Sequence, residues 1–405
     1  MNPRSLYIHV PFCLRRCAYC DFAVTATREP PVDAWLTAIT AELRSLAESN
    51  EGAGPLSLDT VYVGGGTPSL LPEGMMTRLR EALSPWAAWD SKAEWTVEAN
   101  PETLTRALAA DWRAAGVNRL SLGAQTFHEP ALQWMGRLHG ADGPARAFDA
   151  AHAAGIDNVS IDLIFGLPAR LGRDWDADLA RARSLGPTHL SLYGLTAETG
   201  TPLGRWVAEG RERLATEDTY ETEYLTAAAA MDAAGFEHYE VSNFARPGLA
   251  SRHNIVYWRH EPYIGLGPGA HSFIAPVRWW NVRDWAAYAA QVGATGSGRA
   301  DEEIVTRESA ALERIWLGLR ARPGILRATL SEPQVALVDE WRRNGWVGPD
   351  QTYVQPTAAG WLLLDRMAVD LTAAGEAAGI APRFSDDPVP LDGAAAVPGN
   401  SGLNR

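Results

Sequence analysis

Short strand-like runs alternate with longer helical stretches along the first half of the chain, and this alternation restricts the fold more than any other feature. The expected strands are Leu6–Val10, Thr60–Val63, Glu94–Glu98, Arg119–Leu122, Val159–Ile164 and His189–Tyr193. The segments between them carry apolar residues at helical spacing and include Ala34–Leu46, Met75–Leu83, Thr105–Ala115, Pro144–Ala154 and Asp176–Ser184. Such alternation predicts βαβ units with parallel pairing. Six units in a row favour an α/β protein built on a partial (β/α)6 barrel.

The second half of the chain has a different pattern. Residues 331–371 predict two helices, two short strands around Trp346–Val354 and a helix that begins at Pro356, which is typical of a small helical, winged-helix-like domain. The last residues are rich in Pro, Gly, Asp and Ser and have little to bury. We therefore expect a barrel over residues 1–235, a barrel extension over 236–300, a winged-helix-like domain over 301–380 and a disordered tail over 381–405.

The composition bounds the class of protein. Of the 405 residues, 46% are apolar and 21% are charged, as in ordinary soluble proteins. The net charge of −13 argues against broad nucleic-acid binding, which favours a basic face. No run approaches the roughly 18 consecutive apolar residues of a membrane-spanning helix. The first residues lead directly into a strand without a signal-peptide pattern, so we expect a cytoplasmic protein.

All cysteines of the chain lie together, as Cys13, Cys17 and Cys20, directly after the first expected strand. Loops after strands form the functional face of a β/α barrel. Iron–sulfur cubanes usually take four thiolates and structural zinc takes four ligands, so three thiolates leave one metal position open. A zinc site completed by His9 is an alternative, although structural zinc usually comes from paired Cys-x-x-Cys halves.

Further polar residues follow the later strands. The glycine-rich Gly64–Pro68 lets the backbone approach a ligand closely, although a tight turn alone would also explain it. Glu98 suits a ribose diol, because a carboxylate accepts hydrogen bonds from two hydroxyls. Arg137 could hold a carboxylate. Gln125 and Asp162 also lie at strand ends. Each residue alone could be a satisfied core polar group, but several on one barrel face indicate a binding site.

These motifs resemble a known superfamily. Cys13-x3-Cys17-x2-Cys20 with the aromatic Tyr19, the glycine-rich turn and the six-unit array look like the radical S-adenosylmethionine (SAM) superfamily. The segments around them resemble its oxygen-independent coproporphyrinogen III oxidase group over about residues 5–375. The resemblance implies a [4Fe–4S] cluster on the three cysteines, with SAM on the fourth iron. The implied SAM and nucleotide or substrate contacts are Tyr7, Tyr19, Gly65, Gly66, Thr67, Glu98, Gln125, Arg137 and Asp162.

The chain departs from the oxidase at Phe22, where the oxidase has a fourth cysteine, and it lacks the N-terminal extension of the oxidase. Both features resemble the paralogous HemW group of haem chaperones. His253-Asn-Ile-Val-Tyr257-Trp258 resembles a signature of that group. A neutral His253 suits haem iron, and Tyr257 and Trp258 offer flat apolar faces to a porphyrin. The alternative is a buried, satisfied histidine beside two core aromatics.

The sequence thus predicts a haem chaperone that binds a [4Fe–4S] cluster, SAM and haem and passes the haem to an acceptor, for which a respiratory protein is one candidate. An electron donor for the cluster is expected, nucleic acid is not, and membrane contact is at most peripheral. The alternatives are an oxygen-independent coproporphyrinogen III dehydrogenase, another radical SAM enzyme and a zinc-binding module. No catalytic side chain is predicted.

Overall fold

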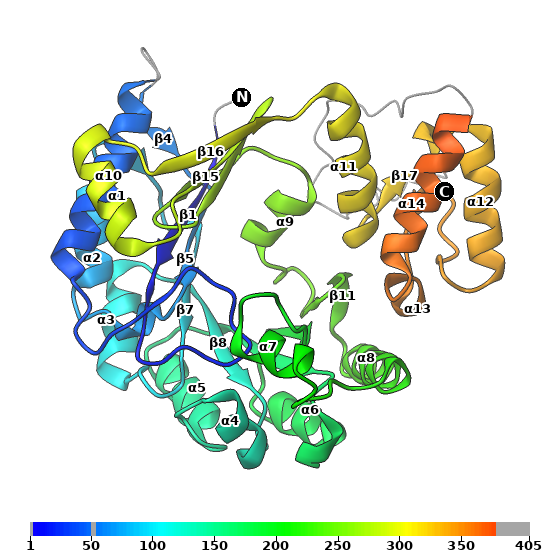
Figure 1. The fold of residues 1–405 in the computed structure, drawn as a ribbon, viewed down its shortest axis with the longest axis horizontal. Coiled ribbons are helices and arrows are strands. Elements are labelled where there is room, and N and C mark those ends of the chain that lie inside the picture. Colours follow the sequence, from blue (N-terminus) through cyan, green and yellow to red (C-terminus); the bar gives the residue numbers. More distant parts are fainter. Residues whose placement is uncertain (1–2, 50–53, 378–405) are drawn as a thin grey trace, which may run out of the picture.

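The computed structural model describes residues 3–49 and 54–377, and its frame is a nine-stranded sheet (Figure 1). Six parallel strands stand side by side in chain order. They are β1 (Ser5–Val10), β5 (Thr60–Gly65), β7 (Glu94–Ala99), β8 (Arg119–Gln125), β9 (Asn158–Phe165) and β10 (His189–Gly194). Beyond β10 lie the antiparallel β12 (Asn243–Ala245) and β11 (Glu237–Glu240), and β13 (Ile264–Leu266) pairs with β1. Among the described residues β11 and β13 do not pair, so the barrel stays open.

Helices connect the strands and cover the outside of the sheet (Figure 1). They are α1 (Val32–Glu48), α2 (Met75–Leu83), α3 (Arg106–Ala115), α4 (Glu129–Met135), α5 (Gly143–Ala153), α6 (Trp175–Ser184), α7 (Pro202–Ala208) and α8 (Glu217–Ala233). The predicted α/β class is confirmed. Of these helices, α3, α6, α7 and α8 begin at a capping side chain, as at Thr105, whose hydroxyl accepts from the Leu108 amide.

The strands alternate between apolar and polar residues, as strands with two different faces do. In β1, Leu6, Ile8 and Val10 are fully buried and belong to the core that the helices share. The residues between them, and their register partners, are polar. They include Ser5, Tyr7, His9, Thr60, Tyr62, Glu94, Thr96, Glu98, Arg119, Ser121, Ser160, Asp162, His189, Ser191 and Tyr193. The hydrophobic core therefore lies between sheet and helices, and the inside of the barrel is polar.

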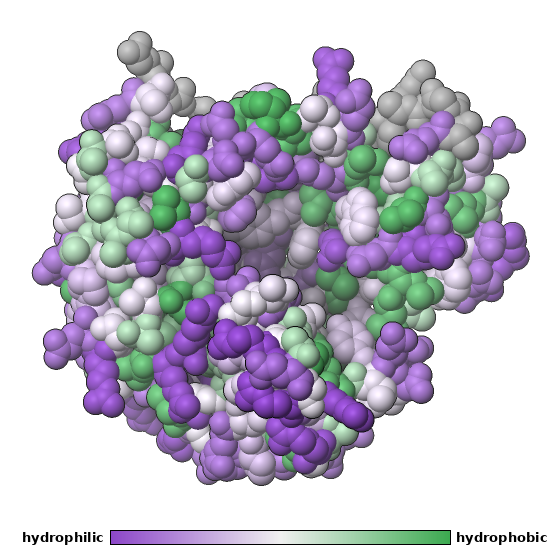
Figure 2. Space-filling view, in the orientation of Figure 1, coloured by the Kyte–Doolittle hydropathy of each residue, from purple (hydrophilic) through white to green (hydrophobic). Residues whose placement is uncertain are grey.

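This polar inside is a hollow. Figure 2 shows a recess at the centre of the molecule, beside the position of α9 (Arg252–Trp258) in Figure 1. Tyr193 is 45% exposed, and yet burial raises the pKa of its hydroxyl. Both observations hold for a side chain that lines a deep, water-accessible recess. Tyr62 and Glu98 also keep part of their surface accessible there.

The remaining elements follow the barrel. An antiparallel sheet is formed by β14 (His271–Ile274), β15 (Val277–Asn281) and β16 (Arg299–Ile304), with α10 (Trp285–Thr295) beside α1. A helical region contains α11 (Arg307–Arg320), α12 (Glu332–Arg343), α13 (Ala358–Trp361) and α14 (Leu364–Ala377). Its two-stranded sheet joins β17 (Ile325–Leu326) to β18 (Tyr353–Val354). Short elements complete the fold: β4 (Leu56–Ser57), β6 (Ala87–Ala88), and single 3-10 turns at Pro68–Leu70, Ala169–Leu171 and Arg327–Thr329.

One detail of the predicted small domain was wrong. Residues 331–371 contain one helix before the strand rather than two, because Gln334, Val338 and Trp341 form a single continuous buried stripe on α12. The regular strand is β18, and its partner β17 precedes α12. The predicted tail over 381–405 lies outside the described residues, and the predicted domain boundaries stay predictions. Within the described ranges no helix is both long and apolar enough to span a membrane.

Candidate functional site

The cysteine loop crosses the carboxyl end of the parallel sheet. It lies between two very short paired strands, β2 (Phe12–Cys13) and β3 (Thr25–Ala26). The Ala18 amide donates to the Met135 carbonyl oxygen after β8, and the Leu203 amide donates to the Ala18 carbonyl oxygen. Cys13, Cys17 and Cys20 are partly buried free thiols. The loop therefore carries all three thiols over the end of the barrel.

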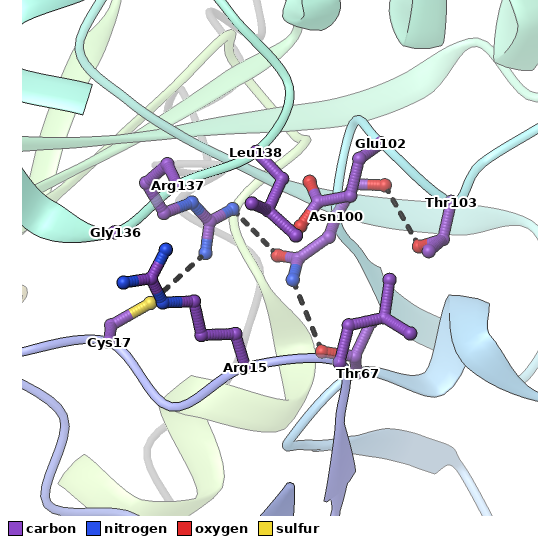
Figure 3. Close-up of a pocket in the computed structure, with 10 residues that line it drawn as sticks. Arg15, Cys17, Thr67, Asn100, Glu102, Thr103, Gly136, Arg137 and Leu138 are labelled. Atoms are coloured by element: carbon purple, nitrogen blue, oxygen red, sulfur yellow. Dashed lines mark hydrogen bonds between the residues drawn. The ribbon is translucent and has the colours of Figure 1, made fainter. Parts of the chain in front are cut away.

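A hydrogen-bonded chain joins two of the cysteines to the strand ends, and Figure 3 shows its part from Thr67 through Asn100 and Arg137 to Cys17. The Thr67 hydroxyl donates to Cys13 Sγ at 3.3 Å, and Asn100 Nδ2 donates to Thr67 Oγ1 at 3.1 Å. Arg137 donates through Nη2 to Asn100 Oδ1 at 2.8 Å and through Nη1 to Cys17 Sγ at 3.8 Å. Arg137 also lines a pocket with Cys17, Arg15 and Thr67. Four loops from different parts of the chain are thereby fixed around the thiols.

The electrostatics of this end favour an anionic, metal-bearing group. Burial raises the pKa of the Cys13 thiol to about 11, and it also raises the pKa of Cys20. A metal must therefore displace the thiol protons, and its charge would stabilise the thiolates. The Arg137 Nε is buried without a hydrogen-bond partner. A guanidinium with a free Nε beside the thiols fits the negative charge of a thiolate-bound iron–sulfur cluster.

The three thiols are not grouped as ligands of one metal ion in the described residues. In the part of the chain that the structure describes, no three Cys, His, Asp or Glu side chains converge as ligands of a single metal ion. In a cubane each thiolate binds its own iron, so such convergence is not needed. His9, the candidate fourth zinc ligand, is hydrogen-bonded through Nδ1 to the Tyr7 hydroxyl and through Nε2 to the Ala23 carbonyl oxygen, both at 2.9 Å.

The glycine-rich turn follows β5 and packs closely against β1. Gly65 has φ of +103°, and a Cβ there would lie 2.2 Å from the His9 ring. A Cβ on Gly66 would lie 2.6 Å from the Val10 carbonyl oxygen. The glycines are therefore required by the close approach of the chain to itself. This packing is an additional reason for the motif, beside the predicted contact with a ligand.

Two carboxylates face the hollow. Glu98 accepts hydrogen bonds from the Tyr62 hydroxyl and the Gly65 amide, both at 2.8 Å. Burial nevertheless raises the pKa of Glu98 to about 7. Asp162 accepts from the hydroxyls of Ser121 and Ser160, and burial raises its pKa as well. Each Glu98 oxygen keeps a free lone pair, which suits the ribose hydroxyls predicted for it.

The remaining predicted residues occupy the same end. Gln125 ends β8 with a φ of +68°, a left-handed conformation that is uncommon for residues other than glycine and is often found at functional sites. Tyr7 lies on the inner face of β1. Tyr19 lies beside Cys17, and burial, with a smaller contribution from the Cys17 charge, raises the pKa of the Tyr19 hydroxyl. The structure thus brings the predicted SAM residues together around one recess.

The predicted haem residues lie at the other end of the barrel. His253 is 1% exposed, and its Nδ1 and Nε2 are hydrogen-bonded to the hydroxyls of Thr60 at 2.7 Å and Tyr257 at 2.9 Å. Thr60 is the first residue of β5, whereas the glycine-rich turn follows its last residues. Burial lowers the pKa of His253 to about 3, so the ring is neutral. Trp258 ends α9, and its Nε1 is buried without a partner.

Sequence reasoning missed several residues of the site. Asn100 bridges Arg137 and Thr67, and Tyr62 donates to Glu98. Tyr193 and Arg119 line the inner faces of their strands. The signal for these residues in the sequence is the alternation of polar and apolar residues along the strands. Every second residue of a barrel strand faces the same side, so this alternation identifies the inner surface.

Comparison with known proteins agrees with this geometry. The model of the radical SAM superfamily matches residues 7–182, which include the cysteine loop, the glycine-rich turn and Asp162. A solved structure of coproporphyrinogen III oxidase (HemN) from Escherichia coli aligns with a TM-score of 0.75 at 23% identity, over 91% of this chain and 90% of that chain. At this identity the likeness shows the fold.

Two curated relatives carry the name heme chaperone HemW. The protein from Bacillus subtilis is 35% identical over 331 residues, which are 81% of this chain and 86% of the relative. The protein from Escherichia coli is 37% identical over 273 residues, which are 67% of this chain and 70% of the relative. Fold and cysteine loop therefore define a radical SAM protein. Within that superfamily the chain belongs to the HemW family, and the predicted resemblance is confirmed.

Proposed function

We propose that this protein binds a [4Fe–4S] cluster, SAM and haem, and that it transfers haem to an acceptor protein in the cytoplasm. The observation that carries the proposal is the three-cysteine loop at the mouth of a polar hollow, in a chain that belongs to the HemW family. The relatives' name, heme chaperone, supports haem as the cargo. Phe22, 60% exposed beside Cys20, stands where the oxidase carries a further cysteine.

The cysteine end would hold the cluster and SAM. Cys13, Cys17 and Cys20 would each bind one iron, and Arg137 would offset the negative charge of the cluster. Gly65, Gly66 and Thr67 would contact the methionine portion of SAM. Glu98 would accept the ribose hydroxyls through its free lone pairs. When bound, the cluster supplies an electron to the sulfonium of SAM, and an external donor must reduce it.

The haem end requires a rearrangement. Both ring nitrogens of His253 are engaged, so the ring offers no lone pair to iron while Tyr257 stays on Nε2. We therefore propose that haem iron binds His253 only after the Tyr257 hydroxyl leaves Nε2. The same movement would expose the Tyr257 ring, and with it Trp258, to the porphyrin face. The bond between His253 Nδ1 and Thr60 would then hold the ring in its ligating orientation.

The test is to measure which cofactors the purified protein holds. After anaerobic reconstitution, iron, sulfide, bound SAM and bound haem are measured per chain, and haem-free globin is offered as a generic acceptor. We expect a [4Fe–4S] stoichiometry, one SAM, bound haem and haem transfer to the globin. Absence of haem binding would overturn the chaperone function, whereas loss of the cluster alone would overturn only the cysteine assignment.

The competing function is oxygen-independent coproporphyrinogen III dehydrogenase, which the fold of HemN favours. Reduced protein is incubated with SAM and coproporphyrinogen under anaerobic conditions. Formation of protoporphyrinogen at a catalytic rate would replace the proposed function with this one. Release of 5′-deoxyadenosine that depends on a different substrate would favour another radical SAM enzyme.

A further inference from the structure

Arg119 is a buried cation on the inner face of the barrel that the proposed function leaves unused. It begins β8, and it is 2% exposed. Its Nε has no hydrogen-bond partner, and none of the ion pairs of the described residues includes it. A buried, unpaired guanidinium is costly, so a partner that joins it on ligand binding would recover much of the lost solvation.

The neighbours of Arg119 do not neutralise it. Burial lowers the pKa of His189 and His253, and the Arg119 charge adds to this lowering; the same charge opposes the rise in pKa that burial causes at Asp162, so these groups lie near Arg119. The nitrogens of both histidines are already bonded to hydroxyls, and the Asp162 oxygens are bonded to serine hydroxyls. Arg119 therefore faces neutral groups and one carboxylate that is hydrogen-bonded elsewhere.

A second unpaired polar atom lies beside it. Thr96 is the register partner of Arg119 on β7, it is fully buried, and its hydroxyl has no hydrogen-bond partner. Partners in register on parallel strands share one face of the sheet. The Arg119 guanidinium and the Thr96 hydroxyl, both without a partner, thus lie together near the amino ends of β7 and β8. We call this end of the hollow its floor.

This floor is separate from the proposed SAM position. Arg119 and Gln125 stand at opposite ends of β8, about 20 Å apart at about 3.3 Å per residue. Gln125 belongs to the cysteine end, whereas Arg119 lies beside His253 of α9. Any group that reaches Arg119 therefore belongs to a ligand at the α9 end of the hollow.

We infer that Arg119, with the Thr96 hydroxyl, receives a carboxylate of the ligand that occupies the hollow, which for a haem cargo is a propionate. The fork of a guanidinium matches a carboxylate with two parallel hydrogen bonds, and Thr96 adds a third donor. The inference rests on the proposed haem function and names the cargo group that the floor of the barrel recognises. It also gives the porphyrin an orientation, with one propionate directed to β8 beside α9.

The experiment compares haem with haem dimethyl ester, in which both propionates are esterified. Each is titrated into the full-length, cluster-loaded protein and followed by the Soret difference spectrum. Wild type, Arg119→Gln and Arg119→Lys are compared. Arg78→Gln is the matched control, because Arg78 is an exposed arginine of α2 that pairs with Asp33 outside the barrel.

We expect wild type to bind haem at least about tenfold more tightly than the diester, as the loss of a charged hydrogen bond implies. Arg119→Gln should weaken haem binding by about tenfold and leave the diester unchanged. Arg119→Lys, which keeps the charge without the fork, should lie between them. Arg78→Gln should behave as wild type.

Equal affinities of wild type for haem and its diester would overturn the inference while leaving the chaperone function intact. An unchanged preference for haem in Arg119→Gln would overturn it as well and make Arg119 a structural charge. If Arg119→Gln does not fold, the wild-type ratio and Arg119→Lys still decide. If wild type binds neither compound, the proposed function fails, and the inference fails with it.

Discussion

The two ends of the hollow are built on opposite principles. At the cysteine end, buried groups keep unused capacity: three free thiols, the Arg137 Nε and a lone pair on each Glu98 oxygen. At the α9 end, His253 is satisfied on both nitrogens, and Glu94 accepts from the first amides of the helix. The first end is prepared to receive a ligand, whereas the second must open before it can bind through His253.

Under the proposed function, this difference would separate a resident cofactor from a cargo. A cofactor that stays bound is held most tightly by preorganised side chains, because these lose little conformational entropy on binding. A cargo must leave again. If the empty site re-forms its internal hydrogen bonds, their formation offsets part of the free energy that release of the cargo costs. Arg119 and Thr96 are the exception at the α9 end, since the Arg119 Nε and the Thr96 hydroxyl have no hydrogen-bond partner.

The largest effect is expected from the cysteines. Cys17→Ala should abolish the [4Fe–4S] cluster, because two thiolates do not hold a cubane with three protein-bound irons. Iron and sulfide per chain, measured after anaerobic reconstitution, should fall to near zero. Thr27→Ala, at the residue that follows β3, is the control and should keep the cluster. A full complement of iron in Cys17→Ala would refute the assignment.

His253→Ala should destabilise the protein by about 2–4 kcal/mol, since it creates a cavity and leaves the hydroxyls of Thr60 and Tyr257 unpaired. Denaturant unfolding measures this loss. Tyr257→Phe removes one hydrogen bond and should cost only about 1 kcal/mol.

The same two variants test whether His253 is the ligand of the haem iron. Tyr257→Phe frees His253 Nε2, so it should bind haem at least as tightly as wild type, whereas His253→Ala should lose the Soret band of the ligated iron. Weaker haem binding in Tyr257→Phe would show that the hydroxyl contacts the cargo itself. A wild-type spectrum in His253→Ala would remove His253 as the ligand.

Glu98 and Glu42 allow a matched test of pH dependence. Burial raises the pKa of both to about 7 on folding, but Glu42 belongs to α1 and is bonded to Gly267 and Tyr288. A carboxyl with a raised pKa takes up a proton on folding. It therefore makes stability fall as pH rises from about 4.5 to 7, with the loss complete above that.

Glu98→Gln and Glu42→Gln should each flatten this decline, by roughly 3 kcal/mol. Unfolding curves between pH 4.5 and 8 measure the change. Only Glu98→Gln should weaken SAM binding, by about tenfold, because only Glu98 faces the hollow. Equal loss of SAM binding in both variants would indicate a general effect of stability.

The smallest effect is expected at Phe22. Phe22→Cys restores the cysteine position of the oxidase on an exposed side chain, and it should leave iron per chain and SAM binding unchanged. The same variant should not form protoporphyrinogen from coproporphyrinogen. Appearance of that activity would mean that this one position separates the two functions.

Much of the fold was predictable because its signals are local. Strand and helix periods repeat within a few residues, so the six parallel strands and their helices could be predicted with boundaries close to those observed. The 331–371 segment was less predictable, since β17, the partner of β18, precedes α12 and lies outside that segment. For the candidate site, the spacing of Cys13, Cys17 and Cys20 was enough to place the three thiols on one loop.

The sequence by itself determined the class of fold, the cysteine loop and the family, because each depends on spacing over a short stretch or on motifs in a fixed order. Only the tertiary structure decided the state of the buried polar groups. Thr60 and His253 are 193 residues apart in the chain, and no local pattern indicates that they bond. Likewise, Arg119 is unpaired only because the neighbouring strands place hydroxyls and neutral rings around it.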